Sequence, residues 1–241
     1  MAEYDLTQFQ NAGELACAVA SVWLDEIACA SQTGRAYCVA LSGGRIAGAL
    51  FSEATRQMRA RNESPSHIHF FCADERCVSP DDAESNYRVA RQLLLDPLGI
   101  AADRIHRVWG EVDPDAAVRE AEAELRRIVP LASYGQPVLD LILLGMGEDG
   151  HVASLFPGEP EAVVSSQAAY RAVTAPKPPP RRVTLGYGVI AAAREVWVLI
   201  SGGGKEAALR ESLRPEGRTP LATVLRSRSR TRIFSDLRLK P

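Results

Sequence analysis

A histidine and a cluster of glycines follow an apolar run in the middle of the chain. The segment 139–158 reads LDLILLGMGEDGHVASLFPG. Its first residues predict a buried strand, and the glycines predict a tight turn that leads into a helix. The positive end of a helix disfavours an imidazolium ion, so His151 is expected to stay neutral and to accept a proton near pH 7. His151 is therefore a candidate general base, with Asp149 placed to fix its tautomer.

Other apolar segments are followed by cationic side chains or by glycine turns. Arg76 follows one such segment, Lys205 follows three glycines at a predicted helix start, and Arg182 comes after a run of prolines beside Arg181. Guanidinium and ammonium groups suit phosphate or carboxylate ligands. The turn Ser42-Gly43-Gly44 also opens a predicted helix, where free N–H groups form a nest for anions.

Each of these residues also has a purely structural interpretation. His151 would cap a helix, Arg76 would join a salt bridge with its neighbouring carboxylates, and Lys205 would be a solvated surface lysine. The chain has no G-x-S-x-G motif, so attack by water is simpler than attack by a side chain. The letters GMGEDG match a dinucleotide-binding motif, but Phe156-Pro157-Gly158 cuts the following helix short, and this function is rejected.

Apolar strands alternate with helices along the chain. This pattern predicts an α/β fold, a parallel sheet covered on both faces, in one domain over residues 1–241. The expected strands lie at 35–41, 67–73, 105–109, 139–144, 196–200 and 231–235. The expected helices lie at 12–31, 46–60, 85–95, 115–129, 183–193 and 205–213. Ligands bind outside the carboxyl ends of parallel strands, so the polar turns that follow four of these strands are expected to form one site.

Composition excludes several classes of protein. The formal net charge of −2 argues against nucleic acid as a partner. No apolar run approaches the ~18–20 residues of a membrane span, and the first residues lack the pattern of a signal peptide. The five cysteines are scattered, which predicts reduced thiols in a cytoplasmic protein without a metal site.

Three blocks of sequence resemble the 6-phosphogluconolactonase family. The block FFCADERCVSPDDAESNYRVARQLLLDPLGI resembles its A-D-E-R to S-N-Y-R region. The segment 139–158 resembles its G-M-G-x-D-G-H-x-A-S-L-F-P signature almost residue for residue. The block PPPRRVTLGYGVIAAAREVWVLISGGGKEAAL resembles its P-x-R-V-T-L segment and G-x-x-K phosphate turn. The spacing agrees over nearly the whole chain.

This resemblance implies a three-layer αβα fold like that of glucosamine-6-phosphate deaminase and ribose-5-phosphate isomerase. It implies hydrolysis of 6-phospho-D-glucono-1,5-lactone to 6-phospho-D-gluconate in the pentose phosphate pathway, without a cofactor. A monomer or homodimer is expected. His151 would be the base, with Asp149 and Asp74 orienting the base, the water or the sugar. The residues implied to hold the phosphate are Arg76, Lys205, Arg182, Ser42, Gly43 and Gly44.

The first glycine turn departs from the family pattern. The family usually reads L-S-G-G-S-T-P, whereas this chain reads LSGGRIA, with Arg45 in place of the first hydroxyl residue. Arg45 either takes over part of the phosphate site or points away from it. Loss of a neutral hydrogen bond costs about 1 kcal/mol, so the change would tune binding and need not abolish it.

Two other functions remain as alternatives. Sugar-phosphate deaminases of this fold resemble the chain at G-x-D-G-H but read D-E-Y and F-N-E-P, where this chain has Arg76 and Phe156. A non-catalytic sugar-phosphate sensor is suggested only by the altered first turn. The intact His151 and Asp149 argue against it.

Overall fold

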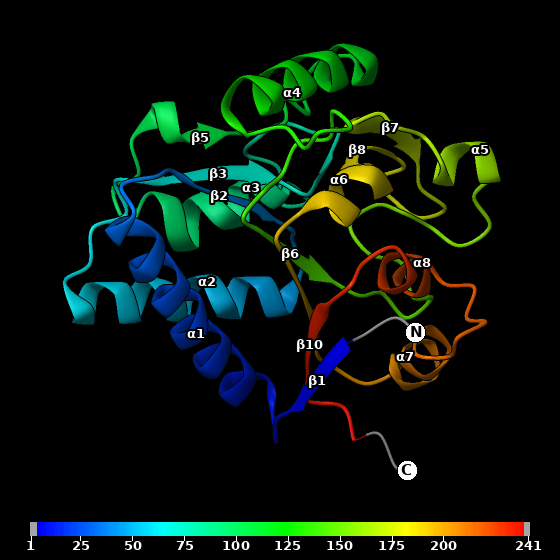
Figure 1. Ribbon diagram of the computed structural model, residues 1–241, viewed down its shortest axis with the longest axis horizontal. Helices are drawn as coiled ribbons and strands as arrows, with labels where there is room; N and C mark the ends of the chain where they lie inside the picture. Colours follow the sequence, from blue (N-terminus) through cyan, green and yellow to red (C-terminus); the bar gives the residue numbers. More distant parts are fainter. Residues whose placement is uncertain (1–3, 239–241) are drawn as a thin grey trace.

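The computed structural model describes residues 4–238, which are built around a seven-stranded sheet (Figure 1). The strand order is β1-β10-β9-β6-β2-β3-β5, and every neighbouring pair is parallel. The strands are β1 (Tyr4–Gln8), β2 (Tyr37–Leu41), β3 (Ile68–Cys72), β5 (Ile105–His106), β6 (Leu141–Gly145), β9 (Glu195–Ile200) and β10 (Thr231–Ser235). The predicted, mainly parallel sheet is confirmed.

A second, three-stranded antiparallel sheet has the order β4-β8-β7. Its strands are β4 (Asp74–Arg76), β7 (Tyr170–Thr174) and β8 (Arg181–Leu185). The helices are α1 (Ala12–Gln32), α2 (Arg45–Arg61), α3 (Asn86–Ala90), α4 (Pro114–Ile128), α5 (Glu161–Val164), α6 (Tyr187–Ala192), α7 (Glu206–Ser212) and α8 (Pro220–Arg226). A π-helical turn (Arg91–Leu95) continues α3, and a 3-10 turn (Ala102–Arg104) precedes β5.

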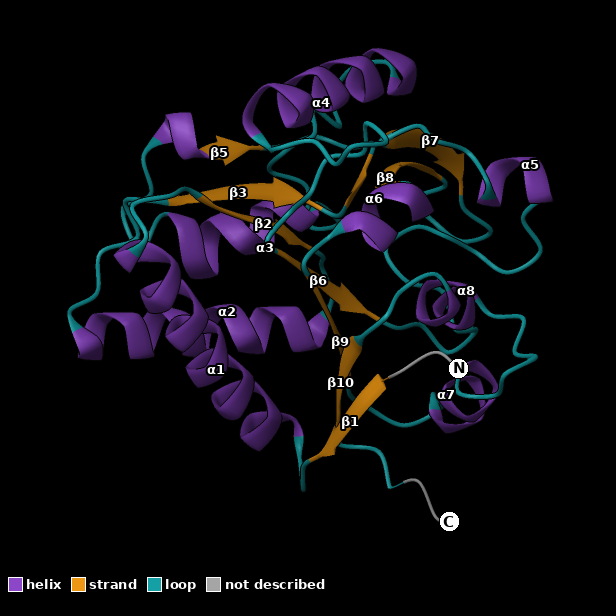
Figure 2. Cartoon of the chain, viewed as in Figure 1, coloured by secondary structure: helices purple, strands orange, loops and turns teal. Residues whose placement is uncertain are grey.

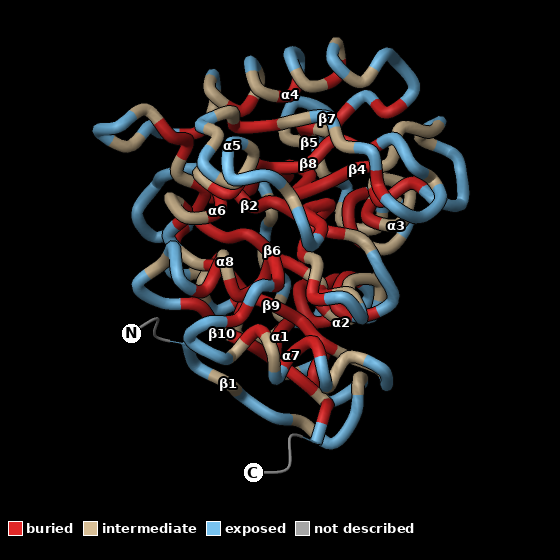
Figure 3. Tube along the Cα trace, turned by 90° about the vertical axis from the view of Figure 1, so that its right-hand side faces the viewer, coloured by how far each residue is buried: buried red, intermediate tan, exposed pale blue. Residues whose placement is uncertain are grey.

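Alternate residues of the central strands pack into two separate cores. Along β2, Val39 and Leu41 face the core that contains α1, α2 and α3. Cys38 and Ala40 face the core that contains α4, α6, α7, α8 and the small sheet. This alternation follows from the period of two in a strand. Helices lie on both sides of the central sheet in Figure 2, and its strands are buried in Figure 3. Because both faces are covered, the central strands are apolar on both sides.

Several predictions about individual elements were wrong. Residues 183–185 form part of strand β8, although the sequence predicted a helix from 183 to 193, and only α6 is helical there. Residues 74–76 form strand β4, where only a strand end was expected. Strand β1 was not predicted, and the strand at 105–109 ends at His106. Pairing of β4 with β8 satisfies their backbone groups and overrides the local pattern.

The helix expected after Gly150 is also absent. The chain instead forms isolated bridges from Val152 to Met146 and to Leu155. Ala153 has a φ of 49°, a left-handed conformation that a helix does not tolerate. The turn that carries His151 is therefore irregular, and its backbone is held by contacts with other segments.

Candidate active site

A cavity of about 330 Å³ opens at the carboxyl ends of the central strands. Its walls come from the turns after β2, β6 and β9 and from the small sheet. The predicted residues that line it are Ser42, Gly43, Gly44, Arg45, Asp74, Arg76, His151, Arg182 and Lys205. Asp149 is the predicted residue that does not line the cavity, but it contacts His151. The expected convergence of distant turns on one site is thus present.

His151 is held by Asp149 through two hydrogen bonds. The imidazole Nδ1 lies within hydrogen-bond distance of Asp149 Oδ1, which also accepts from the His151 backbone N–H at 3.1 Å. A carboxylate only accepts, so the proton sits on Nδ1 and Nε2 carries the free lone pair. Burial acts to raise the pKa of Asp149, but the hydrogen bonds from His151 outweigh burial, so the pKa of Asp149 lies below its usual value. Asp149 is therefore an ionised orienting group.

The neutrality of His151 has a different cause from the one predicted. No helix begins at this turn, so a helix dipole does not act on the ring. Burial lowers the pKa of His151, the hydrogen bond to Asp149 partly offsets this effect, and Lys177 lowers it further. The ring also packs on the backbone of Gly147, where an added Cβ would lie 1.9 Å from the imidazole Cε1. Glycine is required at this position for the ring to lie where it does.

Asp74 and Asn86 form a polar wall of the cavity. Asp74 is buried and accepts hydrogen bonds from Ser154 Oγ at 2.7 Å and from Asn86 Nδ2 at 3.2 Å. Within residues 4–238, Asn86 Oδ1 and Ser42 Oγ are buried and lack a hydrogen-bond partner. Both residues line the cavity, which gives it groups suited to sugar hydroxyls. Asn86 was not among the residues predicted from the sequence, although the S-N-Y-R motif contains it.

Glu75, another residue that was not selected, ties this wall together. Its buried carboxylate accepts from the backbone N–H groups of Arg76 (2.7 Å), Asn86 (2.8 Å) and Tyr87 (2.7 Å) and from Ser85 Oγ (3.1 Å). The start of α3 is thereby joined to β4. The same carboxylate fixes the backbone of Arg76 and of Asn86, which both line the cavity.

Arg76 and Arg182 lie opposite each other on adjacent strands of the small sheet. They occupy paired positions of β4 and β8. Burial, and then the charge of Arg76, lower the pKa of Arg182. Arg76 Nε is buried and has no partner within residues 4–238, although Arg76 Nη1 donates to the carbonyl of Glu84. Two like charges opposite each other are unfavourable in a sheet, so this pair is suited to an anion that bridges them.

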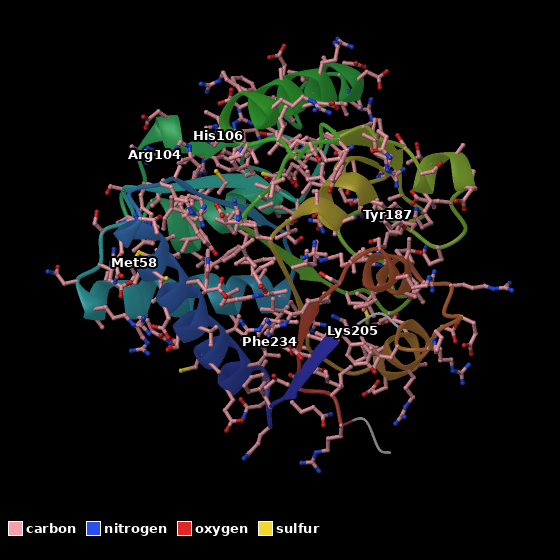
Figure 4. The ribbon with its side chains drawn as sticks, viewed as in Figure 1. Met58, Arg104, His106, Tyr187, Lys205 and Phe234 are labelled. Atoms are coloured by element: carbon pink, nitrogen blue, oxygen red, sulfur yellow. The ribbon has the colours of Figure 1, made fainter. Side chains whose placement is uncertain are left out.

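A second cationic group lies at the start of α7. Lys205, labelled in Figure 4, precedes the first helical residue, and burial followed by the charge of Arg45 lowers its pKa. Arg45 begins α2 and extends toward the turn before Lys205, because a Cβ added at Gly202 would lie 3.7 Å from Arg45 Nη2. Arg45 thus lines the cavity and does not point away. Arg181 is exposed and does not line it.

Lys177 was also not among the residues predicted from the sequence. It lies in the proline-rich segment between β7 and β8, and its Nζ is 3.5 Å from His151 Nε2. In the sequence, Lys177 is a single lysine within APKPPP, and this motif by itself indicates only an extended chain.

The described residues contain no group of three or more His, Cys, Asp or Glu side chains that would hold a metal ion. His69 and His106 form a hydrogen-bonded chain to Glu124 that lies outside the cavity. Over the same part of the chain, no helix has the length and apolar character needed to cross a bilayer. The cysteines are all unpaired.

The chain is similar to proteins of known family. Residues 10–233 match the model of the family described as glucosamine-6-phosphate isomerases/6-phosphogluconolactonase. Human 6-phosphogluconolactonase is 34% identical over 224 residues, which cover 91% of this chain and 85% of the human protein. The solved structure of 6-phosphogluconolactonase from Trypanosoma brucei has a TM-score of 0.83 at 26% identity and covers 98% of this chain and 97% of that one.

A rice protein named probable 6-phosphogluconolactonase 3, chloroplastic, is 36% identical over 190 residues. The match covers 73% of this chain but only 56% of the rice protein, so the chain spans about half of that relative.

Proposed function

The chain belongs to the family of glucosamine-6-phosphate isomerases and 6-phosphogluconolactonases, and we propose that it hydrolyses 6-phospho-D-glucono-1,5-lactone to 6-phospho-D-gluconate, a step of the pentose phosphate pathway. One observation carries this proposal. A neutral imidazole with a free Nε2 lone pair lines the same cavity as two groups of cations. A phosphorylated sugar lactone needs both features, an anion site and a base that activates water.

The cations hold the 6-phosphate. Arg76, Arg182, Lys205 and Arg45 neutralise its charge, and the backbone of the turn 42–44 donates N–H groups to its oxygens. This binding places the lactone ring in the cavity with C1 near His151. The phosphate contacts are the same in the ground state and in the transition state. Loss of one of these residues is therefore expected to raise KM more than it lowers kcat.

His151 then acts as the general base. Its Nε2 removes a proton from water while the water oxygen attacks C1 of the lactone. The tetrahedral intermediate collapses with cleavage of the bond between C1 and the ring oxygen, and His151 returns its proton to that oxygen. The new carboxylic acid ionises at neutral pH, so each turnover releases one proton to the solvent.

The carboxylates and amide have supporting roles. Asp149 keeps the proton on Nδ1 and so keeps Nε2 available as the acceptor. Asp74, held by Ser154 and Asn86, contacts sugar hydroxyls together with the free Asn86 Oδ1. We further propose that the sugar phosphate is the only ligand required. One domain, a monomeric or homodimeric state, a cytoplasmic location and the lack of a nucleic-acid partner stay predictions from the sequence.

Proton release tests this function directly. The purified chain is mixed with freshly prepared lactone in weak buffer, and the uncatalysed hydrolysis rate is subtracted. We expect acid release that saturates with substrate. Ammonia release from glucosamine 6-phosphate would instead support the deaminase alternative. Binding of the lactone without turnover would support a sensor, and either result would overturn the proposal.

A further inference from the structure

Lys177 contacts the one atom of His151 that has to accept a proton. Its Nζ lies 3.5 Å from Nε2 and 5.8 Å from the centre of the Phe156 ring. Phe156 packs against the imidazole with ring centres 5.0 Å apart. The ammonium, the phenyl ring and the imidazole thus form one cluster, in which His151 lines the cavity and Lys177 is exposed beside it.

The two polar neighbours of His151 select the same tautomer. An ammonium has three donors and no acceptor, so it can hydrogen-bond Nε2 only through an unprotonated lone pair. Asp149, on the other side of the ring, requires the proton on Nδ1. The contact with Lys177 therefore marks Nε2 as the basic atom, on geometric grounds alone.

The other cations are placed differently. Arg182 Nε is engaged by the carbonyl of Pro179 at 2.9 Å, and Lys205 lies with Arg45 at the turn before α7. Within residues 4–238, Lys177 makes no other side-chain hydrogen bond. Its four-carbon stem lets the ammonium move over several ångströms without a change in the backbone.

We propose that Lys177 is a second catalytic residue, which contacts Nε2 of His151 in the free enzyme and turns to the C1 oxygen of the bound lactone as negative charge develops there. The inference rests on the proposed function and names the group that stabilises the oxyanion. Water takes the place of the ammonium at Nε2. Lys177 keeps all its protons, so the proton still passes from water to His151 and then to the ring oxygen.

The charges around His151 determine how its titration responds. Asp149 faces it from the same turn, Asp74 from β4 and Lys177 from the proline-rich segment. Both carboxylates favour the imidazolium form and the lysine opposes it. Removal of Lys177 therefore raises the pKa of His151, and activity should then be lost at a higher pH as the solution is acidified.

Three variants test the proposal in the proton-release assay from pH 5 to 9. Lys177→Met removes the ammonium and keeps the stem, Lys177→Arg keeps a cation, and Arg181→Met removes an exposed cation at the start of β8, four residues later. We expect Lys177→Met to lower kcat about 100-fold, as for loss of one oxyanion donor, with KM changed less than about threefold. Its acid limb should move to higher pH, because the charge that lowers the pKa of His151 is removed.

Lys177→Arg should recover part of the lost kcat, and Arg181→Met should match the wild type. NMR titration of His151 in Lys177→Met, without substrate, gives the pKa independently of turnover. The proposal is overturned if Lys177→Met keeps kcat within twofold of the wild type, or if the pKa of His151 does not rise. A wild type without lactonase activity would overturn the proposed function instead, so the two failures are distinguishable.

Discussion

Arg76 and Arg182 are register partners on antiparallel strands, so two guanidinium-bearing residues lie directly opposite each other at one end of the cavity. Burial prevents water from fully screening their repulsion, since Arg182 is only 3% exposed. The protein thus contains an unfavourable charge pair that a bound anion would relieve.

We expect Arg76→Gln to raise KM about 10- to 100-fold with a smaller change in kcat, because a hydrogen bond to a charged group contributes about 1.5–3 kcal/mol. Inorganic phosphate should raise the melting temperature of the wild type more than that of the variant. The control is Arg181→Gln, which removes a cation from the exposed residue next to Arg182. An unchanged KM would remove Arg76 from the phosphate site.

Replacement of His151 by alanine should lower kcat by about 10²- to 10⁴-fold, the usual contribution of a general base. The fold should be retained, because the ring rests on the Gly147 turn at the cavity wall and does not belong to either apolar core. Steady-state kinetics and circular dichroism measure the two effects. Near-normal turnover by the variant would refute the role of His151.

Asp149→Asn should shift the pH profile in the direction opposite to Lys177→Met. Asp149 raises the pKa of His151, so its loss lowers that pKa. A base is active when neutral, and the variant should therefore keep its remaining activity to a lower pH. Its kcat should also fall, since an amide fixes the tautomer less well than a carboxylate. An acid limb that moves to higher pH would contradict this assignment.

Arg45→Thr restores a hydroxyl at the first glycine turn and removes a charge. We expect KM to rise about threefold to fivefold and to depend less on salt, because one long-range attraction to phosphate is lost. KM measured between low and physiological ionic strength tests this. Arg56→Thr removes the same charge from an exposed site on α2, where Arg56 pairs with Glu53, and should leave KM unchanged. A similar effect of both variants would show a general charge effect.

Glu26 should make stability depend on pH. Burial, and then repulsion by Glu195, raise its pKa from 4.5 to about 7. The folded protein therefore binds a proton that the unfolded chain has released, and this stabilisation is present below pH 4.5 and lost as the pH rises to 7. Glu26→Gln should exceed the wild type in stability at pH 8 by about 1 kcal/mol, discounted for partial exposure, and match it near pH 4.5. Denaturant unfolding at both pH values measures the difference, and an equal gain at both would contradict the explanation.

The parallel sheet was predictable because strands such as β6 and β9 are continuous apolar runs that only a doubly covered sheet accommodates. The site followed from this sheet, since the carboxyl ends of its strands meet at one edge. The glycine turns were also predictable from the sequence. Their conformation is local, and Gly44 at the start of α2 has a φ of 102°, which few other residues adopt.

Contacts between distant segments could not be read from local patterns. The three residues of β4 become a strand only because β8, more than a hundred residues later, pairs with them. The contact of Lys177 with His151 depends on how the proline-rich segment packs, and no periodic pattern in the sequence predicts this contact. The missing helix after Gly150 reflects the left-handed Ala153, a conformation that alanine adopts only under tertiary constraint.

The cavity draws its walls from two separate sheets. Asp74, Arg76 and Arg182 belong to the small antiparallel sheet, whereas His151 and Lys205 follow strands of the large one. The small sheet nevertheless packs in the same apolar core as α4, α6, α7 and α8, where its Tyr170, Val183 and Leu185 are buried. Opening of the small sheet would expose this shared core, so thermal inactivation should coincide with loss of bulk structure and should not precede it.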